Sequence, residues 1–168
     1  MQQMWGWLLA CALVISSCNL GASTLPSSGA VRFDEVGRVT RVIDGDTIDV
    51  EIDGVVQRVR YVGVNTPERD EVCYQEAADF NRRLVSGQTV GLVRDRTDTD
   101  RFGRLLRYVY VGETFVNKEL VRGGYAEAVL YEPDDRHWQT FVDLERAAAA
   151  AGLGCHPTGI FDDGSFTR

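Results

Sequence analysis

The sequence predicts an α+β domain in which five β-strands form a barrel and about three helices pack around it. Three observations predict this class. Apolar and polar side chains alternate with period two over residues 39–64, which indicates consecutive strands. A stretch with helical periodicity follows this segment. Two more strand-like segments come after that stretch, at residues 89–94 and 105–111.

The first three strands are expected as a meander over residues 37–64. The middle strand, residues 47–52, alternates strictly between the two faces. The Asp-Gly pair at residues 53–54 then predicts a two-residue hairpin, because Gly tolerates the positive φ that a type I′ turn requires. Residues 55–64 continue the alternation as the third strand, which ends at the Asn-Thr-Pro sequence of residues 65–67.

An amphipathic helix is expected next. Cys73, Ala77, Phe80 and Leu84 recur at spacings of four, three and four, which places them on one face and puts Cys73 on the buried edge. The Ser-Gly pair that follows ends the helix, and the fourth strand covers residues 89–94.

The fifth strand is expected at residues 105–111, after a polar segment, and a short helix over residues 115–122 ends at two glycines. The last helix runs from about residue 134 to residue 151, with Asp134 or Asp135 as its N-cap. A helix between the third and fourth of five strands is the plan of an OB-fold barrel.

Length and composition suit one domain with a sizeable core, since the chain has 168 residues and 44% of them are hydrophobic. The formal charge of −7 argues at face value against a nucleic-acid partner. However, residues 38–110 hold 12 arginines and 13 acidic residues, whereas residues 111–168 hold 5 basic and 10 acidic residues. The predicted barrel is therefore nearly neutral and rich in arginine, so the net charge does not exclude nucleic acid.

The N-terminal segment predicts export. Residues 5–15 form an apolar run that is too short to span a bilayer, which takes about 20 residues, but has the length of a signal-peptide core. The Ile-Ser-Ser-Cys sequence that follows resembles a bacterial lipobox, in which Cys18 becomes the lipid-bearing first residue of the mature protein. The segment before the apolar run carries no Lys or Arg, and ordinary cleavage near Ala22 or Ala30 is the alternative. The protein is thus expected at the membrane through a lipid anchor, or secreted.

Export also bears on the cysteines, because it leaves Cys73 and Cys155 together in an oxidising compartment. One disulfide between them is the simplest outcome and would stabilise the fold by roughly 4 kcal/mol. A zinc site would need His156 and a fourth ligand, and no paired C-x-x-C spacing supports it. The expected organisation is a signal peptide at 1–17, a linker at 18–36, the OB-fold domain at 37–155 and an irregular tail at 156–168.

Several polar residues near the strand ends supply the groups that phosphodiester chemistry needs. Asp46, Asn65 and the Thr66 carbonyl are hard oxygen donors of the kind that calcium takes. Each segment alone has a plainer explanation, such as a hairpin turn or a strand exit. Their joint occurrence in this order favours a functional site.

Three charged residues complete this set. Arg60 and Arg104 carry planar donor forks that fit phosphate oxygens, and Glu68 could hold a water molecule as a general base. Alone, either arginine would usually be read as a solvated surface charge.

The order and spacing of these groups resemble the thermonuclease family, which includes staphylococcal nuclease. Its pattern is an aspartate pair around Gly before a strand, an Arg on the third strand, Asp-Thr-Pro-Glu at the end of that strand, and Tyr/Phe-Gly-Arg after the fourth strand. The match covers about residues 37–152. The resemblance implies a calcium-dependent endonuclease that hydrolyses DNA or RNA, single-stranded or frayed, with a monomer as the default.

Roles follow from the resemblance by position. It implies Asp46, Asn65 and Thr66 as calcium ligands, Arg60, Glu68 and Arg104 as catalytic residues, and Arg101 and Tyr131 as substrate contacts. Asn65 departs from the pattern, because the family has an aspartate there and an amide oxygen binds calcium without a negative charge. Metal affinity and metal choice therefore stay open.

A function of another class is the alternative. A non-catalytic OB-fold module could bind single-stranded nucleic acid or another polyanion through stacking and arginines. The joint presence of Arg60, Glu68 and Arg104 favours the enzyme, because binding alone does not need a carboxylate that activates water.

Overall fold

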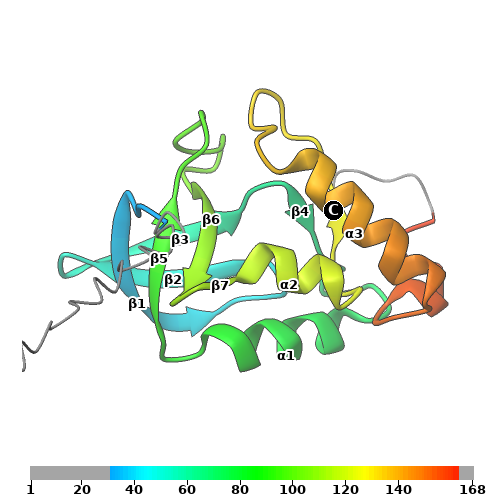
Figure 1. Ribbon diagram of the computed structural model, residues 1–168. Helices are drawn as coiled ribbons and strands as arrows, with labels where there is room; N and C mark the ends of the chain where they lie inside the picture. The colour runs from blue at the N-terminus through cyan, green and yellow to red at the C-terminus, as the bar shows by residue number, and fades with distance from the viewer. Residues whose placement is uncertain (1–30, 163–168) are drawn as a thin grey trace, which may run out of the picture. The chain divides into compact units, whose positions relative to one another are not determined.

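The strands expected from period-two alternation form a sheet that closes on itself (Figure 1). In chain order they are β1 (Glu35–Val42), β2 (Thr47–Ile52), β3 (Val55–Tyr61), β5 (Thr89–Val93) and β6 (Leu105–Val111). Neighbours in the order β3-β2-β1-β5-β6 pair antiparallel, and a parallel pairing of β3 with β6 closes the barrel. The short β7 (Thr114–Phe115) extends β6 at its edge. The predicted five-stranded OB-fold barrel is thereby confirmed.

A computed structural model describes residues 31–162 of the chain. The expected signal peptide, the lipidation site Cys18 and the first part of the linker lie outside the described residues. Strand β1 begins at Glu35, inside the expected linker, and a 3-10 helix, η1 (His156–Thr158), lies in the expected irregular tail. Within the described part, no helix has the length and apolar character needed to cross a membrane.

The third strand is interrupted where the sequence predicted continuity. The Asp53 and Gly54 turn has the expected positive φ values of 51° and 80°, but β3 ends at Tyr61 and Gly63 turns the chain with φ 80°. A Cβ on Gly63 would lie 2.8 Å from the Phe141 ring, so this turn requires glycine. The chain then forms β4 (Val64–Asn65), which pairs with β8 (Glu127–Ala128) outside the barrel sheet.

Three α-helices accompany the barrel in residues 31–162, namely α1 (Tyr74–Val85), α2 (Val116–Arg122) and α3 (Trp138–Ala150). The first two agree with the prediction. The last begins four residues late, and the expected cap at Asp134 or Asp135 is wrong, because His137 is the N-cap. The Asp134 carboxylate instead accepts hydrogen bonds from the backbone N–H groups of Arg96 and Thr97, both at 2.8 Å, and thus ties the helix approach to the loop after β5.

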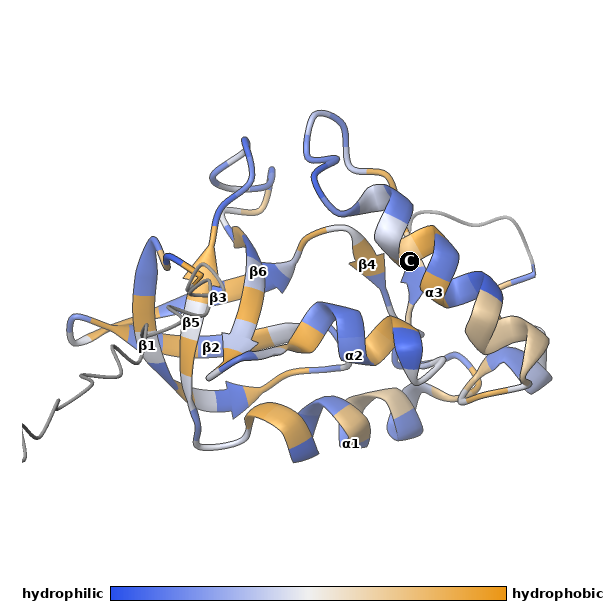
Figure 2. Cartoon of the chain, in the orientation of Figure 1, coloured by the Kyte–Doolittle hydropathy of each residue, from blue (hydrophilic) through white to orange (hydrophobic). Residues whose placement is uncertain are grey.

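The core lies inside the barrel and between the barrel and the helices. Barrel residues such as Ile48, Val59 and Leu92 are fully buried, and Phe141 of α3 joins the same cluster. Figure 2 shows apolar and polar residues interleaved along the strands and helices. The predicted disulfide between Cys73 and Cys155 is present and joins the start of α1 to the segment after α3, across 82 sequence positions.

Candidate active site

The turn between β1 and β2 carries Asp46 into contact with the segment that follows β4. Asp46 Oδ2 accepts hydrogen bonds from the Thr66 backbone N–H at 2.8 Å and from Thr66 Oγ1 at 3.0 Å. A Cβ on Gly45 would lie 2.6 Å from Thr66 Oγ1, so glycine permits this approach. Two predicted metal ligands, 20 positions apart in the sequence, are thus brought together.

Arg60 lies at the centre of the cluster and is almost fully buried. Its Nε faces Asp46 Oδ1 at 3.1 Å, and its Nη2 donates to Asn65 Oδ1 at 2.8 Å. Its Nη1 donates to the carbonyls of Tyr61 and Val64. Burial lowers the pKa of Arg60, but the negative charges around it, of which Asp46 contributes most, together outweigh burial and hold the pKa above its usual value. The guanidinium therefore stays charged inside the protein.

Tyr131 reaches the same cluster from the loop before α3. Its hydroxyl accepts a hydrogen bond from Arg60 Nη2 at 3.3 Å, and its ring centroid lies 5.9 Å from the Arg60 guanidinium carbon. The ring is half-buried, so one part packs on the core while another part remains accessible.

Glu68 lies on the surface immediately after the buried Asn-Thr-Pro segment. Its backbone N–H donates to Glu71 Oε2 at 2.7 Å, which fixes the turn that presents it. Partial desolvation, helped by the negative charge of Asp46, raises the pKa of Glu68, while the charges of Arg60 and Arg104 oppose this rise. The charges of other predicted site residues thus influence the pKa of this carboxyl group.

Arg104 is oriented by Asp100. Asp100 Oδ2 accepts from Arg104 Nε at 2.6 Å, and Asp100 Oδ1 accepts from the backbone N–H groups of Phe102 and Arg104. Although desolvation opposes it, this set of donors lowers the pKa of Asp100. Arg104 and Arg101 both lie over the Phe102 ring, at 5.5 and 4.7 Å from its centroid, and Phe102 is 68% exposed.

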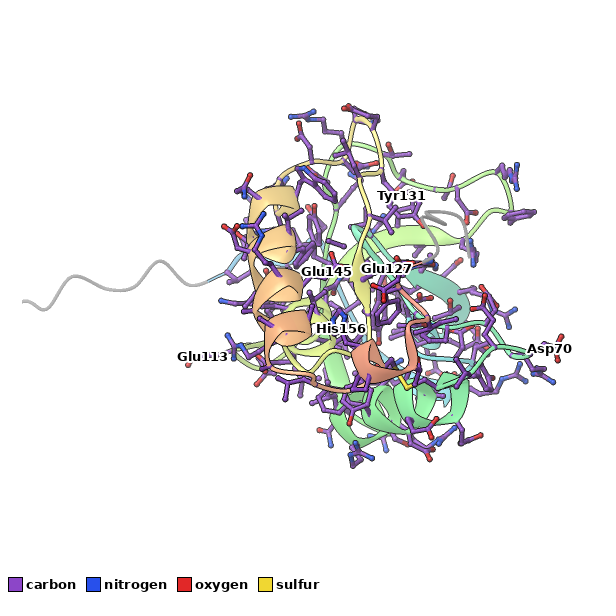
Figure 3. All side chains as sticks on the ribbon, turned by 90° about the vertical axis from the view of Figure 1, so that its right-hand side faces the viewer. Asp70, Glu113, Glu127, Tyr131, Glu145 and His156 are labelled. Carbon is purple, nitrogen blue, oxygen red and sulfur yellow. A yellow bond between two sulfur atoms is a disulfide. The ribbon has the colours of Figure 1, made fainter. Side chains whose placement is uncertain are left out.

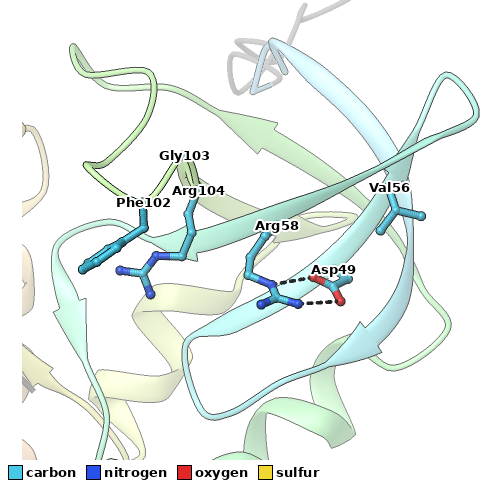
Figure 4. Close-up of a pocket in the computed structure, with 6 residues that line it drawn as sticks. All are labelled: Asp49, Val56, Arg58, Phe102, Gly103 and Arg104. Atoms are coloured by element: carbon cyan, nitrogen blue, oxygen red, sulfur yellow. Dashed lines mark hydrogen bonds and ion pairs between the residues drawn. The ribbon is translucent and has the colours of Figure 1, made fainter.

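A surface groove begins beside Arg104. It has a volume of about 400 Å³, and Figure 4 shows the side chains that line it, namely Asp49, Val56, Arg58, Phe102, Gly103 and Arg104. The Arg58 guanidinium is held by both Asp49 oxygens, at 2.8 and 3.2 Å. The groove therefore offers an exposed ring and guanidinium groups, among them that of Arg104, whose charge also acts on Glu68.

Two site residues were missed by the sequence reasoning. Glu127 of β8 is buried and accepts a hydrogen bond from Asn65 Nδ2 at 3.0 Å. Asp44 accepts from the Asp46 backbone N–H at 3.0 Å, and its burial, with the nearby charge of Asp46, raises its pKa to about 6. Asp44 stood within the recognised turn motif, whereas no signal in the sequence pointed to Glu127.

The oxygen donors fit a calcium ion by their chemistry. Asp46 Oδ1 and Asn65 Oδ1 converge on one guanidinium, and Thr66 is bonded to the same aspartate. Across residues 31–162 no three His, Cys, Asp or Glu side chains are grouped to hold a metal ion. The expected ligand set is of another kind, since it combines one carboxylate with an amide and a backbone carbonyl.

Comparison with known proteins agrees with these motifs. The family described as staphylococcal nuclease homologue matches residues 58–155. The thermonuclease of Staphylococcus hyicus is 33% identical over 150 residues, which cover 84% of this chain and 89% of that protein. The thermonuclease of Staphylococcus intermedius is 39% identical over 105 residues, covering 59% and 62% of the two chains. Endonuclease YncB of Bacillus subtilis is 39% identical over 121 residues, covering 67% and 57%. The chain therefore belongs to the staphylococcal nuclease family.

Proposed function

We propose that the protein is an exported, calcium-dependent nuclease that hydrolyses phosphodiester bonds of DNA or RNA. The observation that carries the proposal is the buried, charged Arg60 held between Asp46 and Asn65. A buried ion pair adds little net stability, because desolvation offsets the attraction between the charges. A guanidinium fork fits phosphate oxygens, and phosphate would bind Arg60 by displacing the neutral oxygen of Asn65 or Tyr131 from Nη2. Names of related proteins, thermonuclease and endonuclease, support the same activity.

Asp46, Asn65 and the Thr66 carbonyl would hold the calcium ion. When bound, calcium supplies positive charge at a non-bridging phosphate oxygen and so favours attack at phosphorus. Arg60, which contacts Asp46 and Asn65, would then bind the same phosphate group from the protein side.

Glu68 is the proposed general base. Its raised pKa makes it a better proton acceptor than an ordinary surface glutamate, and its exposure gives water access. Arg104, oriented by Asp100, would neutralise the charge that develops on the phosphate oxygens as water attacks in line. Both arginines stay protonated, so they act here as charge and hydrogen-bond donors.

The substrate is proposed to be single-stranded or frayed nucleic acid. A base can stack on the exposed Phe102 ring, or on the Arg101 and Arg104 guanidinium groups that lie over it, only when its own face is free. Tyr131 would line the nucleotide side next to Arg60. Lipidation at Cys18 would keep the enzyme at the outer face of a membrane, and cleavage after the signal peptide would release it.

The purified protein, incubated with heat-denatured DNA and either calcium or a chelator, tests the proposal. We expect cleavage in the presence of calcium and no cleavage with the chelator. Glu68→Gln should lower the cleavage rate at least about 100-fold. Asp70→Asn is the matched control, because Asp70 is an exposed acid two positions away (Figure 3). An unchanged rate in Glu68→Gln would remove Glu68 from this role. DNA binding without cleavage by the native protein would support the polyanion-binding module instead.

A further inference from the structure

We propose that Glu127 is a positioning residue for the calcium site, which fixes the orientation of the Asn65 amide and supplies the negative charge that this amide lacks. The inference rests on the proposed metal site. Asn65 and Glu127 are direct partners in the β4–β8 pairing, and Asn65 Nδ2 donates to Glu127 Oε1 at 3.0 Å. Figure 3 shows Glu127 within the protein, whereas Asp70 and Glu113 project from its outline.

The two neighbours of Asn65 allow one amide orientation. A guanidinium can only donate hydrogen bonds and a carboxylate can only accept them. Arg60 at 2.8 Å therefore requires the amide oxygen on its side, and Glu127 requires the amide nitrogen on the other side. Without the Glu127 carboxylate, the amide NH₂ group loses its acceptor and only Arg60 opposes rotation of the amide. Glu127 thus acts with Arg60 to keep the oxygen, the proposed metal donor, on the Arg60 side.

The pair also explains why an amide is tolerated where the family pattern has an aspartate. An aspartate at position 65 would place its carboxylate within hydrogen-bond distance of the Glu127 carboxylate in a buried site, and the two like charges would repel each other. With Asn65, one carboxylate remains, but it lies behind the ligand instead of on the metal. Partners of this kind raise the donor strength of a ligand and hold its orientation.

A charge exchange between the two positions follows from this geometry. In the double variant Asn65→Asp with Glu127→Gln, the amide of residue 127 can donate to the carboxylate of residue 65, so the hydrogen bond persists in the reverse direction. The metal ligand then carries the charge directly. Asn65→Asp alone keeps both carboxylates and gains nothing from the added charge, because repulsion opposes it.

Calcium alone, titrated into the native protein and the variants without substrate and followed by calorimetry and by the shift in melting temperature, tests this inference. We expect Glu127→Gln to weaken calcium binding about tenfold. The double variant should bind at least as tightly as the native protein, and Asn65→Asp alone should bind more weakly than the double variant. Glu145→Gln is the matched control, because Glu145 is a partly buried glutamate that bonds to the β8 backbone at Ala128. Its calcium affinity should be unchanged.

Unchanged calcium affinity in Glu127→Gln, or a double variant no better than Glu127→Gln, would overturn the inference. The double variant retains the hydrogen bond and decides the question if Glu127→Gln does not fold. A native protein that binds calcium without cleaving DNA would refute the nuclease proposal, but the effect of Glu127 on calcium affinity could still be measured. A native protein that binds no calcium would overturn both metal-based statements.

Discussion

Reduction of the Cys73–Cys155 disulfide should lower the free energy of unfolding by about 4.5 kcal/mol. The bond joins positions 82 apart, and closing a loop of that length removes about 15 cal/mol/K of entropy from the unfolded chain, or about 4.5 kcal/mol at 25 °C. Reduction removes no side-chain heavy atom, so it creates no cavity by truncation. The estimate therefore isolates the constraint on the unfolded chain.

Urea unfolding of the protein with and without dithiothreitol measures this difference. The slope of unfolding free energy against urea should also rise on reduction, because a chain without the cross-link exposes more surface when unfolded. A Cys73→Ala, Cys155→Ala variant serves as the control, since dithiothreitol should not change its unfolding. A loss below about 1 kcal/mol in the native protein would refute the loop-entropy reasoning.

Four further predictions concern other parts of the molecule. Gly45→Ala places a Cβ 2.6 Å from Thr66 Oγ1, so the free energy of unfolding measured in urea should fall by about 1–3 kcal/mol and cleavage should slow. Full activity would contradict the tight contact. Phe102→Ala should leave stability unchanged within about 0.5 kcal/mol but raise KM for denatured DNA roughly tenfold, and an unchanged KM would remove the ring from the substrate path. Burial raises the pKa of Glu145, so the folded protein holds the proton on this carboxyl group more tightly than the unfolded chain does. The stability that Glu145 contributes is therefore present at low pH and is lost as the pH rises above about 4.5 through the raised pKa. The unfolding free energy of Glu145→Gln minus that of the native protein should therefore be larger at pH 7 than at pH 4. An equal difference at the two pH values would contradict this. If export and lipidation occur as proposed, Cys18→Ala should move the protein from the membrane fraction to the medium, and an unchanged distribution would refute lipidation.

Two buried arginines show how different partners give different roles. Arg107 of β6 is fully buried and bonds to Glu35 at 2.7 and 2.9 Å and to Asp98 at 2.7 Å. Its charge is thus satisfied by two carboxylates, as suits a structural ion pair. Arg60 instead has Asp46 as its carboxylate partner and neutral oxygens elsewhere. Because all five N–H groups of Arg60 are engaged, we expect phosphate to bind there by displacing one of these neutral partners.

Local patterns in the sequence were sufficient for most of the barrel. Period-two alternation located β1, β2 and β3, whereas β5 and β6 were located as strand-like segments and are buried along nearly their whole length. The break at Gly63 was not predictable from that pattern, since it depends on the Phe141 ring, which arrives from α3. The start of α3 was misplaced for a similar reason, because Asp134 bonds to the distant backbone of Arg96 and Thr97 instead of capping the helix.

The candidate site likewise contains residues that local sequence patterns predicted and residues that they did not. Asp46, Arg60 and Asn65 were found because they sit at fixed spacings around turns and strand ends, and the structure brings them into contact. Glu127 was missed because its relation to Asn65 depends on a pairing between two-residue strands 62 positions apart. Such short strands leave no periodic signal. Contacts of this kind are set by the packing of the whole domain.

The single-turnover rate of DNA cleavage by Arg60→Lys, compared with Arg107→Lys, tests the central claim most directly. Lysine keeps the charge but loses the planar fork, and both substitutions are made at buried arginines. If the cluster around Arg60 is the catalytic centre, Arg60→Lys should cleave at least about 100-fold more slowly. Folded Arg107→Lys should stay within about threefold of the native rate, because its effect falls on stability. A folded Arg60→Lys variant that cleaves at the native rate would contradict the claim.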